Sequence, residues 1–167
     1  MVWVGSKAEG KYLALSLVKM FAQVDALVPN RNRTIGPDGS IGDPSHQART
    51  SDHNAWVQNG PYRVVTAIDI THDPVGGFDS YAFAEMLRIN RDPRIKYVIS
   101  NRRIFGDEAY AARNNATAWR WRAYGGDNPH DHHVHISVNP NVAQFDSTTP
   151  WKIGPMVVTT PMPIPAG

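Results

Sequence analysis

Cysteine is absent from this chain of 167 residues. Thiolate metal ligands, disulfide bonds and a cysteine nucleophile are therefore excluded, and a metal site would have to be built from histidine and carboxylate side chains. The absence of cysteine does not by itself fix the cellular compartment. A chain of this length is one domain's worth and can bury a core without disulfides. Aromatic residues make up 10% of it, which supports a globular fold.

Long apolar runs are absent too. No segment approaches the roughly 20 residues of a membrane-spanning helix, so we expect no membrane span. The N-terminus lacks a basic start followed by an apolar stretch, so the sequence predicts no signal peptide. The formal net charge is only +2, and Lys and Arg are spread along the chain. This distribution argues against a dedicated nucleic-acid surface, and we expect no nucleic-acid partner.

Histidine, in contrast, is concentrated in one place. Four of the seven histidines lie between His130 and His135. From His133 to Val138 polar and apolar residues alternate, which is typical of a half-buried strand. His133 and His135 should therefore project from one face of that strand. Such a pair indicates a metal or proton-transfer site whose other members come from elsewhere in the chain.

Asp69 is a second unusual residue. It interrupts a short, β-branched run from Val64 to Ile70, which predicts a buried strand. A buried carboxylate needs a cation or several hydrogen-bond donors. A salt bridge to an arginine and a bound metal ion both meet that need, and this strand alone does not distinguish between them.

Two helices are expected. Ser6 and Glu9 have the spacing of a capping box, and the apolar period after them continues until Pro29, so the first helix should occupy this segment. A second should begin at residue 79 or 80 and end near Asn90.

Two further strands are expected, over residues 96–100 and 119–124. A hairpin between the second of these and the histidine strand would bring Arg120 or Arg122 close to the histidine pair.

The C-terminal segment, residues 155–167, is rich in proline. We expect a domain of residues 1–150 and a linker or tail of residues 151–167, with a further module beyond it.

Three separated motifs occur in the order Ser-x-His, Ala-x-Asp and His-x-His, at Ser51-Asp52-His53, Ala67-Ile68-Asp69 and His133-Val134-His135. This set resembles the signature of the zinc peptidases that include D-alanyl-D-alanine carboxypeptidases, lysostaphin and murein endopeptidases. The resemblance implies an α+β fold, with a small antiparallel β-sheet flanked by helices and one zinc ion at the sheet face. The ligands would be His53, Asp69 and His135, which leave a fourth tetrahedral position open, as in catalytic zinc sites.

Two departures from the family pattern are visible. His53 and Asp69 are sixteen residues apart, more than is usual in the family, so residues 55–63 look like an inserted loop. Many relatives carry an acidic residue three positions before the last ligand, where this chain has His132. The spacing of His130, His133 and His135 is similar to that of the murein endopeptidase branch.

The resemblance also suggests roles for neighbouring residues. His133 is the first candidate for the general base because it shares the strand face with His135, and His130 and Asp131 are the other candidates. Relatives carry substrate-binding polar residues just before and within the Ser-x-His motif, which here correspond to Arg49, Gln47 and Ser51.

The implied function is a zinc-dependent peptidase that hydrolyses stem or cross-link peptides of bacterial peptidoglycan, as an endopeptidase or a D,D-carboxypeptidase. We expect a monomeric phage or prophage endolysin module, with a cell-wall-binding domain beyond the linker. It would be made in the cytoplasm of the infected or lysogenic host and would act on the wall after release.

Two alternatives stay open. Related folds keep zinc for recognition, so the chain could be a non-catalytic zinc-containing module that binds the cell wall. The histidine run and a pI near 9.0 would also suit a histidine-based metal nuclease, although that function leaves Ser51, His53 and Asp69 unexplained.

Overall fold

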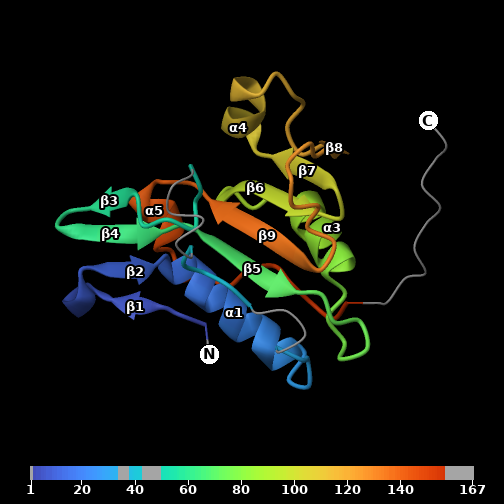
Figure 1. Ribbon diagram of the computed structural model, residues 1–167, viewed down its shortest axis with the longest axis horizontal. Helices are drawn as coiled ribbons and strands as arrows, with labels where there is room; N and C mark the ends of the chain where they lie inside the picture. Colours follow the sequence, from blue (N-terminus) through green and yellow to red (C-terminus); the bar gives the residue numbers. More distant parts are fainter. Residues whose placement is uncertain (1, 34–37, 43–49, 157–167) are drawn as a thin grey trace.

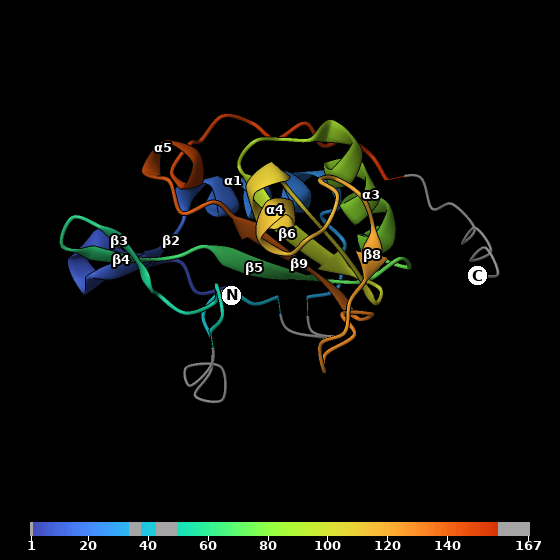
Figure 2. The ribbon, with the colours of Figure 1, turned by 90° about the horizontal axis from the view of Figure 1, so that it is seen from above.

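The structure is a computed structural model that describes residues 2–33, 38–42 and 50–156. Two β-sheets lie side by side, and helices α1 and α3 cover one face of the larger sheet (Figures 1 and 2). This arrangement confirms the predicted α+β class.

The first sheet has the strand order β1-β2-β4-β3. Its strands are β1 (Gly5–Ser6), β2 (Lys11–Leu13), β3 (Val57–Asn59) and β4 (Tyr62–Val65). The β2–β4 pair is parallel and the other two pairs are antiparallel. The segment predicted to be an inserted loop therefore forms most of the β3–β4 hairpin, which turns at Gly60 with a φ of 59°.

The first helix begins later than predicted. The Ser6–Glu9 capping box exists, with the Glu9 N–H donating to Ser6 Oγ at 3.3 Å, but it caps a single 3-10 turn, η1 (Lys7–Glu9). Gly10 ends that turn in the left-handed region, the chain continues as β2, and α1 is Leu15–Leu27. The apolar period from Leu13 onward was a correct sign of a helix, whereas the cap belonged to a separate turn.

The second sheet is antiparallel, with the order β5-β9-β6-β7-β8. Its strands are β5 (Ala67–Thr71), β6 (Ile95–Ser100), β7 (Arg103–Gly106), β8 (Arg122–Ala123) and β9 (His133–Val138). The helices that follow α1 among the described residues are α3 (Ser80–Asn90), α4 (Glu108–Arg113) and α5 (Val142–Phe145). The predictions of α3, β6 and β9 are confirmed.

The core lies between the second sheet and the helices. The alternation in β9 places Val134, Ile136 and Val138 in this core, each fully buried. Phe83 and Leu87 of α3 belong to the same buried cluster. The opposite face of the sheet is thereby left to the polar residues of β5 and β9.

Two predictions about strands were wrong. The run from Val64 to Ile70 is not one strand: β4 and β5 are separated at Thr66, and each belongs to a different sheet. The expected hairpin with the histidine strand is also absent, because β8 pairs with β7 at the far edge of the sheet. Strands β6 and β7 separate β8 from β9, so that pairing does not place Arg120 or Arg122 next to His133.

Trp151, the first residue of the predicted tail, is buried. Its indole N–H donates to the Ser16 carbonyl at 2.8 Å, and the Arg94 guanidinium stacks 3.7 Å from the ring centroid. Residues 157–167, the rest of the predicted tail, lie outside the described residues, so the linker remains a prediction. No helix among the described residues is both long and apolar enough to cross a membrane.

Candidate metal centre

Asp69 and His135 lie directly opposite each other in the pairing of β5 with β9. Directly opposed residues on one sheet face bring their side chains together. Asp69 Oδ1 and His135 Nδ1 are 3.1 Å apart. The strand register therefore creates two thirds of the predicted ligand set.

His53 completes the set from the loop before β3. Its Nε2 lies 3.1 Å from His135 Nδ1 and 3.3 Å from Asp69 Oδ1. Ligand atoms at zinc bond lengths on a tetrahedron are separated by about 3.3 Å. The triangle formed by His53, Asp69 and His135 thus has the size of one face of a tetrahedral zinc site, and these residues could hold a metal ion.

The hydrogen bonds of the two imidazoles direct the remaining nitrogens into this triangle. His53 Nδ1 donates to the Ser40 carbonyl at 2.7 Å, so Nε2 is left as a lone-pair donor. His135 Nε2 contacts Ser137 Oγ at 2.9 Å, leaving Nδ1 to face the other two atoms. A single hydrogen on His135 Nδ1 could serve only one of its two neighbours well. A cation at the centre would bind all three atoms of the triangle. In metal-bound histidines the ring nitrogen that does not bind the metal typically has a hydrogen-bond partner, as both rings have here.

The electrostatics of the triangle agree with a site for a cation. Burial alone would raise the pKa of Asp69, but His53 and His135 hold it well below its usual value. Burial and the charge of His53 lower the pKa of His135, against the effect of Asp69. Against burial, Asp69 and the Ser40 carbonyl raise the pKa of His53. Asp69 is therefore ionised and attracts positive charge.

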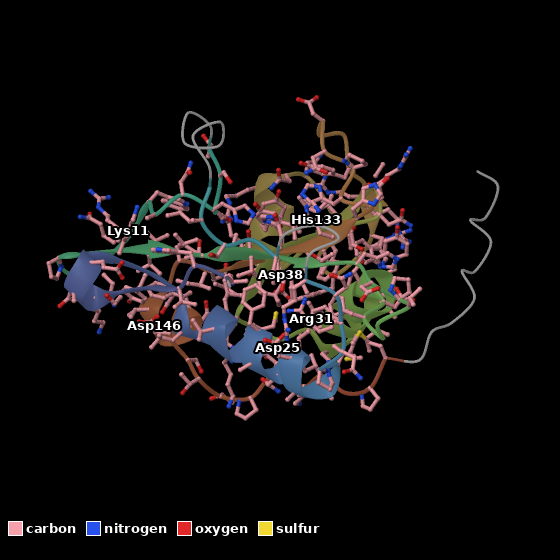
Figure 3. All side chains as sticks on the ribbon, turned by 60° about the horizontal axis from the view of Figure 1, so that its bottom comes forward. Lys11, Asp25, Arg31, Asp38, His133 and Asp146 are labelled. Atoms are coloured by element: carbon pink, nitrogen blue, oxygen red, sulfur yellow. The ribbon has the colours of Figure 1, made fainter. Side chains whose placement is uncertain are left out.

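The segment that carries Ser40 is held against β5 by the two residues that precede Ser40. The Gly39 and Asp69 backbones exchange hydrogen bonds of 3.0 and 2.8 Å. Asp38 accepts from the Thr71 N–H at 3.0 Å and pairs with the buried Arg31 at 2.6 Å. Arg31 also binds Asp25 of α1 and lies between the two aspartates in Figure 3. An ion cluster between α1 and the outer strand β5 thereby helps to position the carbonyl that orients His53.

Asp52 holds the other side of the His53 loop. Its carboxylate is buried and pairs with Lys96 of β6 at 2.9 Å. It also accepts from the indole of Trp56 at 3.1 Å, and its carbonyl accepts from the Thr66 N–H between the two sheets. Asp52 thus connects the loop to both sheets.

His133 and His130 lie beside the triangle. His133 Nε2 is 3.7 Å from Asp69 Oδ2, and its side chain is partly exposed, whereas His135 is buried. Figure 3 shows His133 where side-chain nitrogens gather over the sheet. The His130 ring packs edge-on against His133, with centroids 4.8 Å apart, and its Nδ1 donates to the Asn128 carbonyl at 2.7 Å. Burial and the neighbouring charges of His135 and His133 lower the pKa of His130 to about 4.

The other predicted residues contribute differently. The Asp131 carboxylate lies 3.6 Å from His132 Nε2, whose side chain is 92% exposed. Ser51 Oγ accepts from the His53 N–H at 3.2 Å, so it shapes the loop that presents His53. Arg49 and Gln47 lie outside the described residues, and their substrate-binding roles remain predictions.

Three contributors were not predicted as site residues. Ser40 acts through its carbonyl, which no side-chain pattern reveals. Ser137 was recognisable as the next polar residue on the face of His135. Tyr97 of β6 stacks on His135 with centroids 5.3 Å apart. Its position depends on β6 pairing with β9.

A surface pocket of about 440 Å³ lies elsewhere, among Pro93, Asp107 and the 139–141 segment. It contains none of the candidate residues. Comparison with known proteins adds no family assignment: no protein-family model, curated protein or solved structure matches the chain significantly.

Proposed function

We propose that this protein is a zinc-dependent peptidase that hydrolyses stem or cross-link peptides of bacterial peptidoglycan. The observation that carries the proposal is the triangle of His53 Nε2, Asp69 Oδ1 and His135 Nδ1, with separations of 3.1–3.3 Å. Two imidazoles and one carboxylate with an open fourth position are the ligand pattern of hydrolytic zinc sites. The motif resemblance supplies the peptidoglycan substrate.

Zinc is the metal that this donor set favours. No thiolate is available, and imidazole nitrogen with carboxylate oxygen suits zinc better than the all-oxygen sites of magnesium or calcium. When bound, a zinc ion would polarise a substrate carbonyl and acidify a water molecule at the open position. Ser40 and Ser137 would hold the two imidazoles in the required orientation.

His133 is the residue we propose as general base. It reaches the same sheet face as the ligands, its Nε2 lies near the second oxygen of Asp69, and solvent reaches it. A base in this position takes a proton from the attacking water and returns it to the leaving amine. His130 packs against the ring and restricts its orientation. Asp131 is the less favoured alternative because it lies beside His132.

The proposed biological setting follows from the sequence resemblance. The protein would act as the lytic module of a phage or prophage endolysin, with peptidoglycan as its partner. A cell-wall-binding module after the proline-rich segment belongs to the same proposal.

Digestion of purified peptidoglycan tests this function. The zinc-loaded protein should release new amino termini, and mass spectrometry of the products should identify the bond. The Asp69→Ala and His135→Ala variants should lose both metal and lysis. Full lytic activity of either variant would refute the proposal. Zinc and wall binding without new amino termini would indicate a recognition module, and cleavage of plasmid DNA would indicate a nuclease.

A further inference from the structure

The candidate metal centre lies at one end of a row of residues that crosses the second sheet. The strand pairings place Asp69 opposite His135, His135 opposite Ile99, Ile99 opposite Ile104, and Ile104 opposite Arg122. Residues in such a row share one face of the sheet. Arg122 on the edge strand β8 is therefore on the same face as the metal ligands, although it is not beside them.

An aromatic surface runs along this face in the same direction. Tyr97 stacks on His135, and Tyr110 of α4 stacks on Tyr97 with centroids 4.7 Å apart. Gly106 lies opposite Tyr97 in β7, and a Cβ atom there would come within 2.4 Å of the Tyr110 ring. The absence of a side chain at Gly106 is what allows Tyr110 to lie on the sheet and extend the stack.

The aromatic surface ends at positive charge. Arg122 is close enough to act on the Tyr110 hydroxyl, whose pKa is raised by burial and lowered in part by this guanidinium. Arg113 lies 6.0 Å from the Tyr110 ring centroid on the same helix. Arg31, Arg88 and Arg94 each bind a carboxylate, but no ion pair in the described part of the chain includes Arg113 or Arg122. Both are exposed.

We propose that the Tyr97–Tyr110 surface and Arg122 form an extended substrate subsite that binds a carboxylate of the peptide being cleaved. The inference rests on the proposed peptidase function and deepens it. Three strand spacings separate Arg122 from His135, about 14 Å. At about 3.3 Å per extended residue this span corresponds to about four residues, so the bound carboxylate would lie within about four extended residues of the cleaved bond. An exposed, unpaired arginine beside a stacked aromatic surface suits an anionic peptide.

A matched pair of substrates tests this subsite. One is a stem peptide with free carboxylates on D-Glu and diaminopimelate, and the other is the same peptide with both groups amidated. We expect the zinc-loaded full chain to cleave the free acid with a KM about 10-fold lower, the size of one charge-assisted hydrogen bond. In Arg122→Ala this preference should disappear with little change in kcat, and Arg122→Lys should restore part of it. Arg63→Ala is the control, because Arg63 is also exposed but lies on β4 in the other sheet.

The outcomes separate the subsite from the peptidase function. If cleavage occurs and Arg122→Ala keeps the preference, the subsite is wrong while the function stands. If neither peptide is cleaved, the affinity of each peptide for the zinc-loaded protein, measured by calorimetry, tests the subsite. Tighter binding of the free acid that depends on Arg122 supports the subsite without the function, and equal binding overturns it. Arg122-dependent binding of an oligonucleotide without any effect on the peptides would also overturn it.

Discussion

His53 and His135 are separated by 82 residues in the sequence, yet His53 Nε2 and His135 Nδ1 lie 3.1 Å apart in a buried space. Both nitrogens also lie beside Asp69 Oδ1. The second nitrogen of each ring has its own hydrogen-bond partner: His53 Nδ1 bonds to the Ser40 carbonyl and His135 Nε2 to Ser137 Oγ. These bonds fix the orientation of both rings. The arrangement can be tested one contact at a time.

The metal stoichiometry depends on the triangle. We expect about one zinc per chain in the purified protein, and less than a tenth of that in Asp69→Ala or His135→Ala, because two ligands alone bind weakly. Elemental analysis after dialysis measures this. His132→Ala is the control, since the His132 side chain is 92% exposed and supplies none of the three ligand atoms. Equal zinc content in all the proteins would exclude the assigned ligands.

Ser137→Ala should weaken zinc binding while the fold is kept. The substitution removes the partner of His135 Nε2, and loss of such a contact typically reduces metal affinity about 10- to 100-fold. Competition with a chromogenic chelator gives the affinity. Ser100→Ala provides a matched buried serine, because its Oγ has no hydrogen-bond partner among the residues that the structure describes. A similar loss in both variants would mean that the effect is general destabilisation.

His133→Ala should separate catalysis from metal binding. The variant is expected to retain zinc, since the three ligands remain, and to lose about 10²- to 10⁴-fold in kcat if His133 is the base. Steady-state cleavage of a stem peptide and metal analysis of the same sample provide the two readouts. Undiminished kcat in this variant would transfer the role to His130 or Asp131.

Arg31→Met should destabilise the whole domain. The Asp38 side chain is only 3% exposed, so removing its cation leaves a buried charge unpaired, at about 3–5 kcal/mol of unfolding free energy. Denaturant unfolding measures the change. Arg33→Met is the comparison, because Arg33 is 46% exposed and its partner Asp25 is 41% exposed, so we expect less than about 1 kcal/mol. Equal losses of unfolding free energy in the two variants would contradict the prediction that the buried Arg31–Asp38 pair contributes more than the exposed Arg33–Asp25 pair.

Asp92 should contribute to the loss of folding stability at acid pH. Burial would raise its pKa, but hydrogen bonds from Arg94 outweigh burial and lower the pKa below the ordinary value of an aspartate. A lowered folded-state pKa means that the stabilisation is present above about pH 4 and is lost as the pH falls through the folded-state pKa. Asp92→Asn should therefore reduce stability at pH 7 by about 1 kcal/mol and by less near pH 2. Unfolding curves at the two pH values check the difference, and an equal loss at both would contradict it.

Local patterns in the sequence were sufficient for several elements. The two-residue alternation from His133 to Val138 correctly predicted a strand with both histidines on one face, because side-chain direction in a strand depends only on position along it. The second helix was also predictable, since its apolar spacing and its cap at Asp79 lie within a few residues of each other. The capping box at Ser6 misled because the same local geometry serves a single 3-10 turn.

By itself, the sequence determined which side chains could take part: the motif order singled out His53, Asp69 and His135 before any contact was known. Tertiary structure alone decided that these atoms meet, because the register of β5 against β9 and the Ser40 carbonyl depend on packing between distant segments. It also decided where β8 lies. A hairpin was predicted to bring Arg120 or Arg122 next to the histidines, but strand pairing places Arg122 three strands away on the same face. Strand pairing is non-local, because packing of the core determines which strand edges come together. A short-range sequence pattern therefore does not encode it.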